Sequence, residues 1–188
     1  MEPSELLRRL VDVLDRQQIR YLVTGSVATT TYGESRFTND IDVVVELGMG
    51  NVDAFCATFA APEFYCSRDS VIEAIRQHFQ FNILHPKSGF KIDVFIPEDS
   101  DFNRSRFNRR VRIAGADGHE TWFASPEDVI IKKMTYYQKG RSEKHLRDIA
   151  GVLKIKEDKV DREYIAAWAG RLQLLDIWRE ILKQAAKS

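Results

Sequence analysis

Residues 40–45 read DIDVVV, a short run in which Asp40 and Asp42 alternate with apolar residues. Successive side chains of a strand point to opposite faces, so the run predicts a strand with both carboxylates on one face. Two carboxylates this close repel each other unless a cation lies between them, and oxygen ligands of this kind suit Mg²⁺. An acidic pair on a solvated strand face is the alternative interpretation.

The run KIDVFI at residues 91–96 predicts a second strand, in which Asp93 interrupts an apolar pattern. Lys91 lies two residues away on the same face, so an ion pair between the two is one explanation. The other places Asp93 beside Asp40 and Asp42 on a neighbouring strand. Three carboxylates would then be available for two metal ions, which activate an attacking hydroxyl and stabilise a leaving pyrophosphate.

The dipeptide Gly25-Ser26 follows a short apolar run, Tyr21-Leu22-Val23, and precedes a helix predicted from Val27 to Tyr32. Glycine lets a phosphate approach the backbone, and the N-terminus of a helix offers N–H groups to an anion. Ser26 can add its hydroxyl. A Gly-Ser turn is common by itself, but beside three carboxylates it indicates a nucleotide phosphate site.

The remaining pattern predicts an α+β fold, with a small mixed β-sheet flanked by helices and a helical C-terminal part. Ser4 is predicted to cap a first helix, and Ser70 with Glu73 to form the capping box of another. Ser125-Pro126 predicts the start of a long helix. Strand pairs are expected over residues 79–84 with 90–96 and over 109–114 with 120–123. We expect an α/β core at 1–124 and a helical segment packed on it at 125–188.

The composition of the chain argues against a disordered protein and against a membrane protein. The chain has 188 residues, of which 44% are hydrophobic and 30% are charged, as in ordinary globular proteins. Its net charge of zero argues against nucleic-acid binding through a global basic field. The arginines between Arg104 and Arg112 leave RNA binding open as a local alternative. No apolar run is long enough to cross a bilayer, so we expect a cytoplasmic protein with no membrane partner.

The motifs LVTGS at 22–26, DIDV at 40–43 and IDV at 92–94 together resemble the signature of the polymerase-β-like nucleotidyltransferase superfamily. The run RFTND at 36–40 is similar to one found in the branch that contains nucleotidyltransferases of abortive-infection and toxin–antitoxin systems. The resemblance implies that Arg36 and Thr38 help bind the nucleotide. It further implies that Lys133 reaches the triphosphate and that Asp148 orients this lysine or helps activate the acceptor; Lys132, its neighbour, competes for the role of Lys133.

The sequence therefore predicts an enzyme that moves a nucleoside monophosphate from an NTP to an acceptor hydroxyl. Asp40, Asp42 and Asp93 would hold two Mg²⁺ ions, or Mn²⁺ in their place, and Gly25, Ser26, Arg36, Thr38 and Lys133 would bind the nucleotide. The acceptor stays open among tRNA, protein and small molecules, and the branch implies a cognate antitoxin. A catalytically silent nucleotide- or protein-binding module of the same fold is the alternative, beside an RNA-binding protein.

Overall fold

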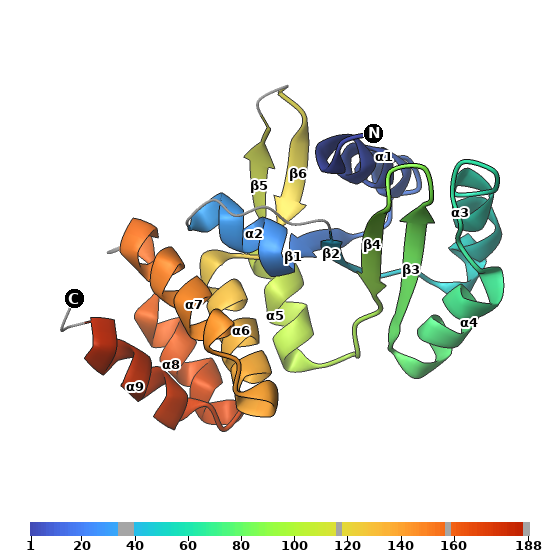
Figure 1. Ribbon diagram of the computed structural model, residues 1–188. Coiled ribbons are helices and arrows are strands. Elements are labelled where there is room, and N and C mark those ends of the chain that lie inside the picture. Colours follow the sequence, from blue (N-terminus) through green and yellow to red (C-terminus); the bar gives the residue numbers. More distant parts are fainter. Residues whose placement is uncertain (34–39, 116–117, 157–158, 186–188) are drawn as a thin grey trace. The chain divides into compact units, whose positions relative to one another are not determined.

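The computed structural model describes residues 1–33, 40–115, 118–156 and 159–185 (Figure 1). The chain forms two compact units. The first unit comprises Met1–Val27 and Phe37–Phe123, and the second comprises Ala28–Arg36 and Ala124–Ser188. The expected packing of segment 125–188 on the core stays a prediction. Within the described ranges, no helix has both the length and the apolar character needed to cross a membrane.

The first unit is built on a mixed sheet, drawn as arrows in Figure 1, whose described strands follow the order β3-β4-β2-β1-β6-β5. The pairs β2·β4 and β1·β6 are parallel, and the other neighbouring pairs are antiparallel. This confirms the α+β expectation and both predicted strand pairs. The strands are β1 (Tyr21–Thr24), β2 (Asp40–Val45), β3 (Gln80–His85), β4 (Phe90–Phe95), β5 (Val111–Ala114) and β6 (Glu120–Phe123).

The helices of the first unit correct two predicted caps. Its helical elements are α1 (Pro3–Arg16), η1 (Met49–Asn51), α3 (Val52–Thr58), α4 (Arg68–Gln77) and α5 (Asp101–Arg109). The cap of α1 is Glu2 rather than Ser4, and the Glu2 N–H donates to Glu5 Oε2 at 2.8 Å. The cap of α4 is Ser67, whose hydroxyl accepts from the N–H of Ser70 at 3.3 Å. The predicted Ser70 capping box is therefore wrong, because the chain is already helical there.

Helix α2 (Gly25–Tyr32) begins directly after β1, two residues before the predicted start. Its residues up to Val27 belong to the first unit and those from Ala28 to the second. The other described helices of the second unit are α6 (Pro126–Gly140), α7 (Glu143–Lys156), α8 (Arg162–Arg171) and α9 (Leu175–Ala185). Helix α6 starts as predicted: the Ser125 hydroxyl accepts from the Asp128 N–H at 3.2 Å. It ends at Gly140 because Arg141 adopts a left-handed conformation with φ of 51°.

Candidate active site

The three predicted carboxylates lie on two adjacent strands of the first unit. Asp40 and Asp42 belong to β2 and Asp93 to β4, and these strands pair in parallel with Asp42 directly opposite Asp93. Residues in register on neighbouring strands point to the same face of the sheet. Asp93 is nearly buried, with 9% of its surface exposed. The predicted placement of Asp93 beside the Asp40–Asp42 pair is thus what the sheet produces.

Gly25 brings the β1–α2 junction against this carboxylate group. Thr24, the last residue of β1, pairs with Asp42 across the antiparallel β1·β2 ladder. Gly25 follows with φ of +63°, and a Cβ at this position would lie 1.8 Å from Asp42 Oδ2. Only glycine therefore allows both this backbone conformation and the close approach of Asp42. Ser26 comes next, in the first turn of α2.

Lys91 supplies positive charge within the same group. Its ammonium Nζ lies 2.9 Å from Asp93 Oδ2 and 3.8 Å from Asp40 Oδ1. Asp40 is its register partner on β2. The hydrogen bond to Asp93 and the charges of the three aspartates raise the pKa of Lys91 above its usual value, against the opposing effect of burial. The ion pair between Lys91 and Asp93 is therefore present, and Asp93 lies beside Asp42 on the neighbouring strand, while a shared metal site stays a prediction.

Asn82 is a polar neighbour that the sequence interpretation missed. It lies on β3 directly opposite Asp93, and with its amide oriented to donate, its nitrogen is 2.7 Å from Asp93 Oδ1. The turn from Pro86 to Gly89 fixes the register of the β3–β4 hairpin. Because His85 pairs with Phe90 across that turn, Asn82 lies opposite Asp93. The strand predicted at 79–84 stops one residue short of His85, so counting from its pairing with 90–96 would have placed Asn82 opposite Ile92.

The donor types of this group suit a hard divalent cation, because Mg²⁺ and Mn²⁺ prefer carboxylate oxygens. In the part of the chain that the structure describes, no three His, Cys, Asp or Glu side chains converge as a ready metal site. The ammonium of Lys91 instead contacts Asp93 and lies near Asp40. The residues therefore fit a metal in their chemistry, and Lys91 contributes positive charge beside Asp93 and Asp40.

Lys133 and Asp148 form a partly buried ion pair in the second unit. Lys133 lies on α6 and Asp148 on α7, and the Nζ–Oδ2 distance is 2.5 Å. Only 6% of the Lys133 side chain and 13% of the Asp148 side chain are exposed. Lys132 differs from its neighbour: its ammonium lies 5.3 Å from the ring centroid of Tyr136. Of the two lysines, Lys133 is the one that Asp148 positions.

His145, on α7, lies near the same ion pair. Burial, followed by the positive charge of Lys133, lowers the pKa of its imidazole below the usual value, although Asp148 acts in the opposite direction. Its ring also contacts that of Tyr136, with 5.7 Å between the centroids.

Arg36 and Thr38, the two remaining sequence-predicted nucleotide ligands, lie outside the described residues.

The arginine-rich stretch has structural partners in the first unit. Arg104 pairs with Asp99 and Asp101. The guanidinium of Arg110 lies 4.4 Å from the ring centroid of Trp122, and it donates to the carbonyl of Tyr21 at 3.3 Å. Arg110 therefore packs within the first unit and Arg104 forms surface ion pairs, while RNA binding by this stretch stays a prediction.

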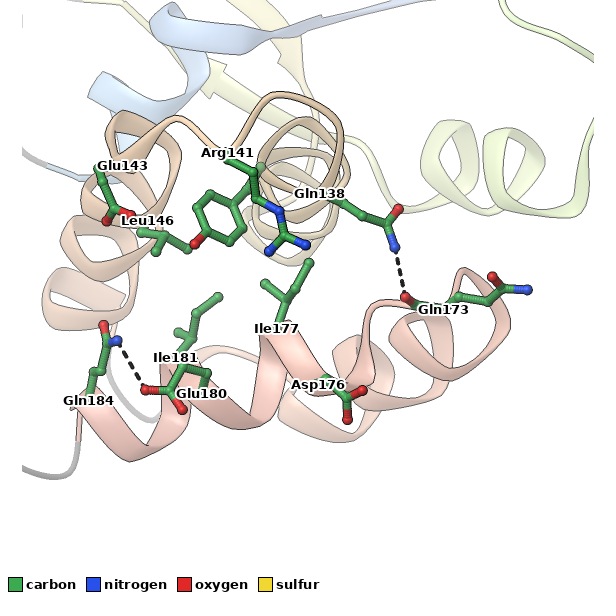
Figure 2. A pocket seen from close by; sticks show the side chains of 11 residues that line it. Gln138, Arg141, Glu143, Leu146, Gln173, Asp176, Ile177, Glu180, Ile181 and Gln184 are labelled. Carbon is green, nitrogen blue, oxygen red and sulfur yellow. Dashed lines mark hydrogen bonds between the residues drawn. The ribbon is translucent and has the colours of Figure 1, made fainter.

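A cavity of about 400 Å³ lies in the second unit, between α6, α7 and α9 (Figure 2). Ile177 and Ile181 of α9 line one side. Polar groups around it bond to each other: Gln138 donates to the carbonyl of Gln173 at 2.9 Å, and Gln184 donates to Glu180 at 3.2 Å. Among the site residues that the structure describes, none lines this cavity.

Comparison with known protein families finds no match, and comparison with curated proteins finds none either. Solved structures do match. ANT(2'')-Ia in complex with adenylyl-2''-tobramycin is 12% identical with a TM-score of 0.57, covering 89% of this chain and 97% of its own. The lincosamide antibiotic adenylyltransferase LnuA, lincomycin-bound, is 11% identical with a TM-score of 0.51, covering 82% and 98%. An antigenic nucleotidyltransferase-like protein from Paracoccidioides brasiliensis is 18% identical with a TM-score of 0.50, covering 93% and 88%.

Identities this low establish the fold alone. The chain therefore has a nucleotidyltransferase-like α+β fold, and its strand–Gly-Ser–helix junction and its aspartates on adjacent strands lie within that fold.

Proposed function

We propose that this protein is a metal-dependent nucleotidyltransferase that moves a nucleoside monophosphate from an NTP to an acceptor hydroxyl. The observation that carries the proposal is the register of Asp42 against Asp93 on parallel strands, with Asp42 packed against the backbone of Gly25. This brings a phosphate-compatible turn and a carboxylate group to one place in the first unit. The fold shared with nucleotidyltransferases supports the same reaction class.

In the proposed reaction, the acceptor oxygen bonds to the α-phosphorus of the NTP, and the bond from that phosphorus to the bridging oxygen breaks. Pyrophosphate leaves with the bond electrons, and Asp93 accepts the proton of the acceptor hydroxyl. Asp40, Asp42 and Asp93 would hold Mg²⁺, as two ions, or Mn²⁺. The metal would supply charge stabilisation for the phosphates and a more acidic acceptor hydroxyl.

The triphosphate carries several negative charges, which the proposal assigns to other residues of the chain. Gly25 and Ser26 would bind phosphate oxygens through the α2 N-terminus and the Ser26 hydroxyl. Lys133 would neutralise the triphosphate, and Asp148, its partner at 2.5 Å, would orient its ammonium. Arg36 and Thr38 are assigned to nucleotide binding by the sequence resemblance alone.

Two of the structural neighbours indicate which acceptors to test first. One was solved with adenylyl-2''-tobramycin and the other is an adenylyltransferase with bound lincomycin. The first substrates to test are therefore ATP as nucleotide donor and small hydroxyl-bearing molecules as acceptors, followed by tRNA and protein as acceptors. The toxin-like branch, a cognate antitoxin and a cytoplasmic location remain further proposals from the sequence.

The test incubates each α-labelled NTP with Mg²⁺, protein and either a small-molecule panel, total tRNA or cell lysate. We expect a labelled product and pyrophosphate from the wild type. Asp93→Asn should lower turnover by about 10²- to 10⁴-fold, the usual contribution of a general base, while NTP binding persists. Asp99→Asn is the matched control, because Asp99 pairs with Arg104 on the surface.

Asp93→Asn protein that transfers label as fast as the wild type would show the mechanism to be wrong. Calorimetric binding of an NTP without any labelled product in lysate would instead identify a silent nucleotide-binding module.

A further inference from the structure

Lys91 contacts the aspartates of the candidate active site but has no role in the proposed reaction. It precedes Asp93 by two residues on β4, so both side chains extend from the same face of the strand. Its ammonium contacts Asp93 at 2.9 Å and lies 3.8 Å from Asp40 on the neighbouring strand. Its ammonium thus lies near proposed metal ligands of two strands, Asp93 of β4 and Asp40 of β2.

We propose that Lys91 is the resident counter-cation of these aspartates, and that a divalent metal ion binds only by displacing its ammonium from Asp93. The inference rests on the metal-binding role that the proposed function gives to Asp40, Asp42 and Asp93. The reason is electrostatic: an ammonium and a divalent metal ion beside the same carboxylate repel each other, so the Lys91 ammonium opposes metal binding as long as it stays at Asp93.

The exposure of the two partners shows which one can move. The Lys91 side chain is 32% exposed, whereas that of Asp93 is 13% exposed. Lysine has a flexible four-carbon stem and a well-hydrated ammonium, so its charged end can leave toward solvent at low cost. Asp93, held by strand pairing on both sides, stays in place. When no metal is bound, Lys91 therefore offsets the repulsion between the aspartates. When a metal binds, Lys91 competes with it and lowers its affinity.

The experiment measures Mn²⁺ binding to nucleotide-free protein by the electron paramagnetic resonance signal of unbound Mn²⁺. Lys91→Met keeps the length of the side chain and removes its charge. A partly exposed ion pair of this kind is weak, so this variant should bind Mn²⁺ about fivefold more tightly than the wild type, which corresponds to about 1 kcal/mol. Lys91→Gln is the second variant, and Lys91→Arg, which keeps the charge, should stay close to the wild type.

Lys87→Met is the matched control, because Lys87 is an exposed lysine in the turn of the same β3–β4 hairpin. It removes one positive charge near the sheet without removing a contact to the aspartates, and should leave Mn²⁺ affinity unchanged. Circular dichroism of each variant verifies that it is folded.

Equal or weaker Mn²⁺ binding by folded Lys91→Met and Lys91→Gln would overturn the inference. So would equal tightening by Lys87→Met, since the effect would then be one of overall charge, and so would the absence of Mn²⁺ binding in every variant. The labelled-NTP assay tests the proposed function separately. Tighter Mn²⁺ binding without any transfer product would refute the reaction while supporting the role of Lys91.

Discussion

Gly25→Ala tests the packing at the centre of the candidate active site. Alanine at this position must adopt φ near +63°, and its Cβ would lie 1.8 Å from Asp42 Oδ2 and 2.7 Å from Asp42 Cβ. The left-handed conformation costs about 1–2 kcal/mol for a residue with a Cβ. Overpacking against Asp42 adds about 1–3 kcal/mol. We therefore expect the free energy of unfolding to fall by about 2–5 kcal/mol.

Gly89→Ala separates these two costs. Gly89 also has positive φ, +74°, but a Cβ there would meet nothing within 4 Å. It should lose only the conformational part, about 1–2 kcal/mol. Urea denaturation followed by circular dichroism measures both variants, and for a chain of this length each kcal/mol also shifts Tm by roughly 2–4 °C.

A double variant localises the clash further. Asp42→Ala removes the oxygen and the carboxyl carbon that lie closest to the added Cβ, but leaves Asp42 Cβ at 2.7 Å. Part of the loss should therefore return, giving a coupling energy of about 1 kcal/mol in a double-mutant cycle. If Gly25→Ala costs no more than Gly89→Ala, Asp42 does not occupy the space beside Gly25, and the reasoning about this site fails.

Two other predictions concern the second unit. Lys133→Met should lower the free energy of unfolding by about 1–3 kcal/mol, because it leaves the partly buried carboxylate of Asp148 without its partner. Urea denaturation measures this loss. Lys132→Met is the comparison and should change the free energy of unfolding little, and the double variant Lys133→Met/Asp148→Leu should recover most of the loss. Equal losses for Lys133→Met and Lys132→Met would contradict the argument. The pKa of His145 is lowered in the fold, so the unfolded chain binds the proton more readily and stability should fall as pH drops through and below about 6.5. Thermal unfolding between pH 5 and 8 measures this, and a His145→Gln variant with the same pH slope would show that other groups are responsible.

Local patterns in the sequence determined much of the fold. Alternation at residues 40–45 and 91–96 identified β2 and β4 and placed their aspartates on strand faces, because the period of a strand is a property of a few consecutive residues. Ser125-Pro126 determined the start of α6 for a similarly local reason. The caps at Glu2 and Ser67 were missed because neighbouring polar residues can compete for the same role, and only the backbone path selects one of them.

The sequence by itself thus determined which residues could form the site: Asp40, Asp42, Asp93 and the Gly25-Ser26 turn. Only the tertiary structure decided that β4 pairs in parallel with β2, so that Asp93 faces Asp42 and Lys91 reaches both Asp93 and Asp40. The physical reason is that strand pairing depends on burial and hydrogen bonding between distant segments, which no short window of sequence contains. The same holds for Gly25, whose necessity comes from the Asp42 side chain packed against it.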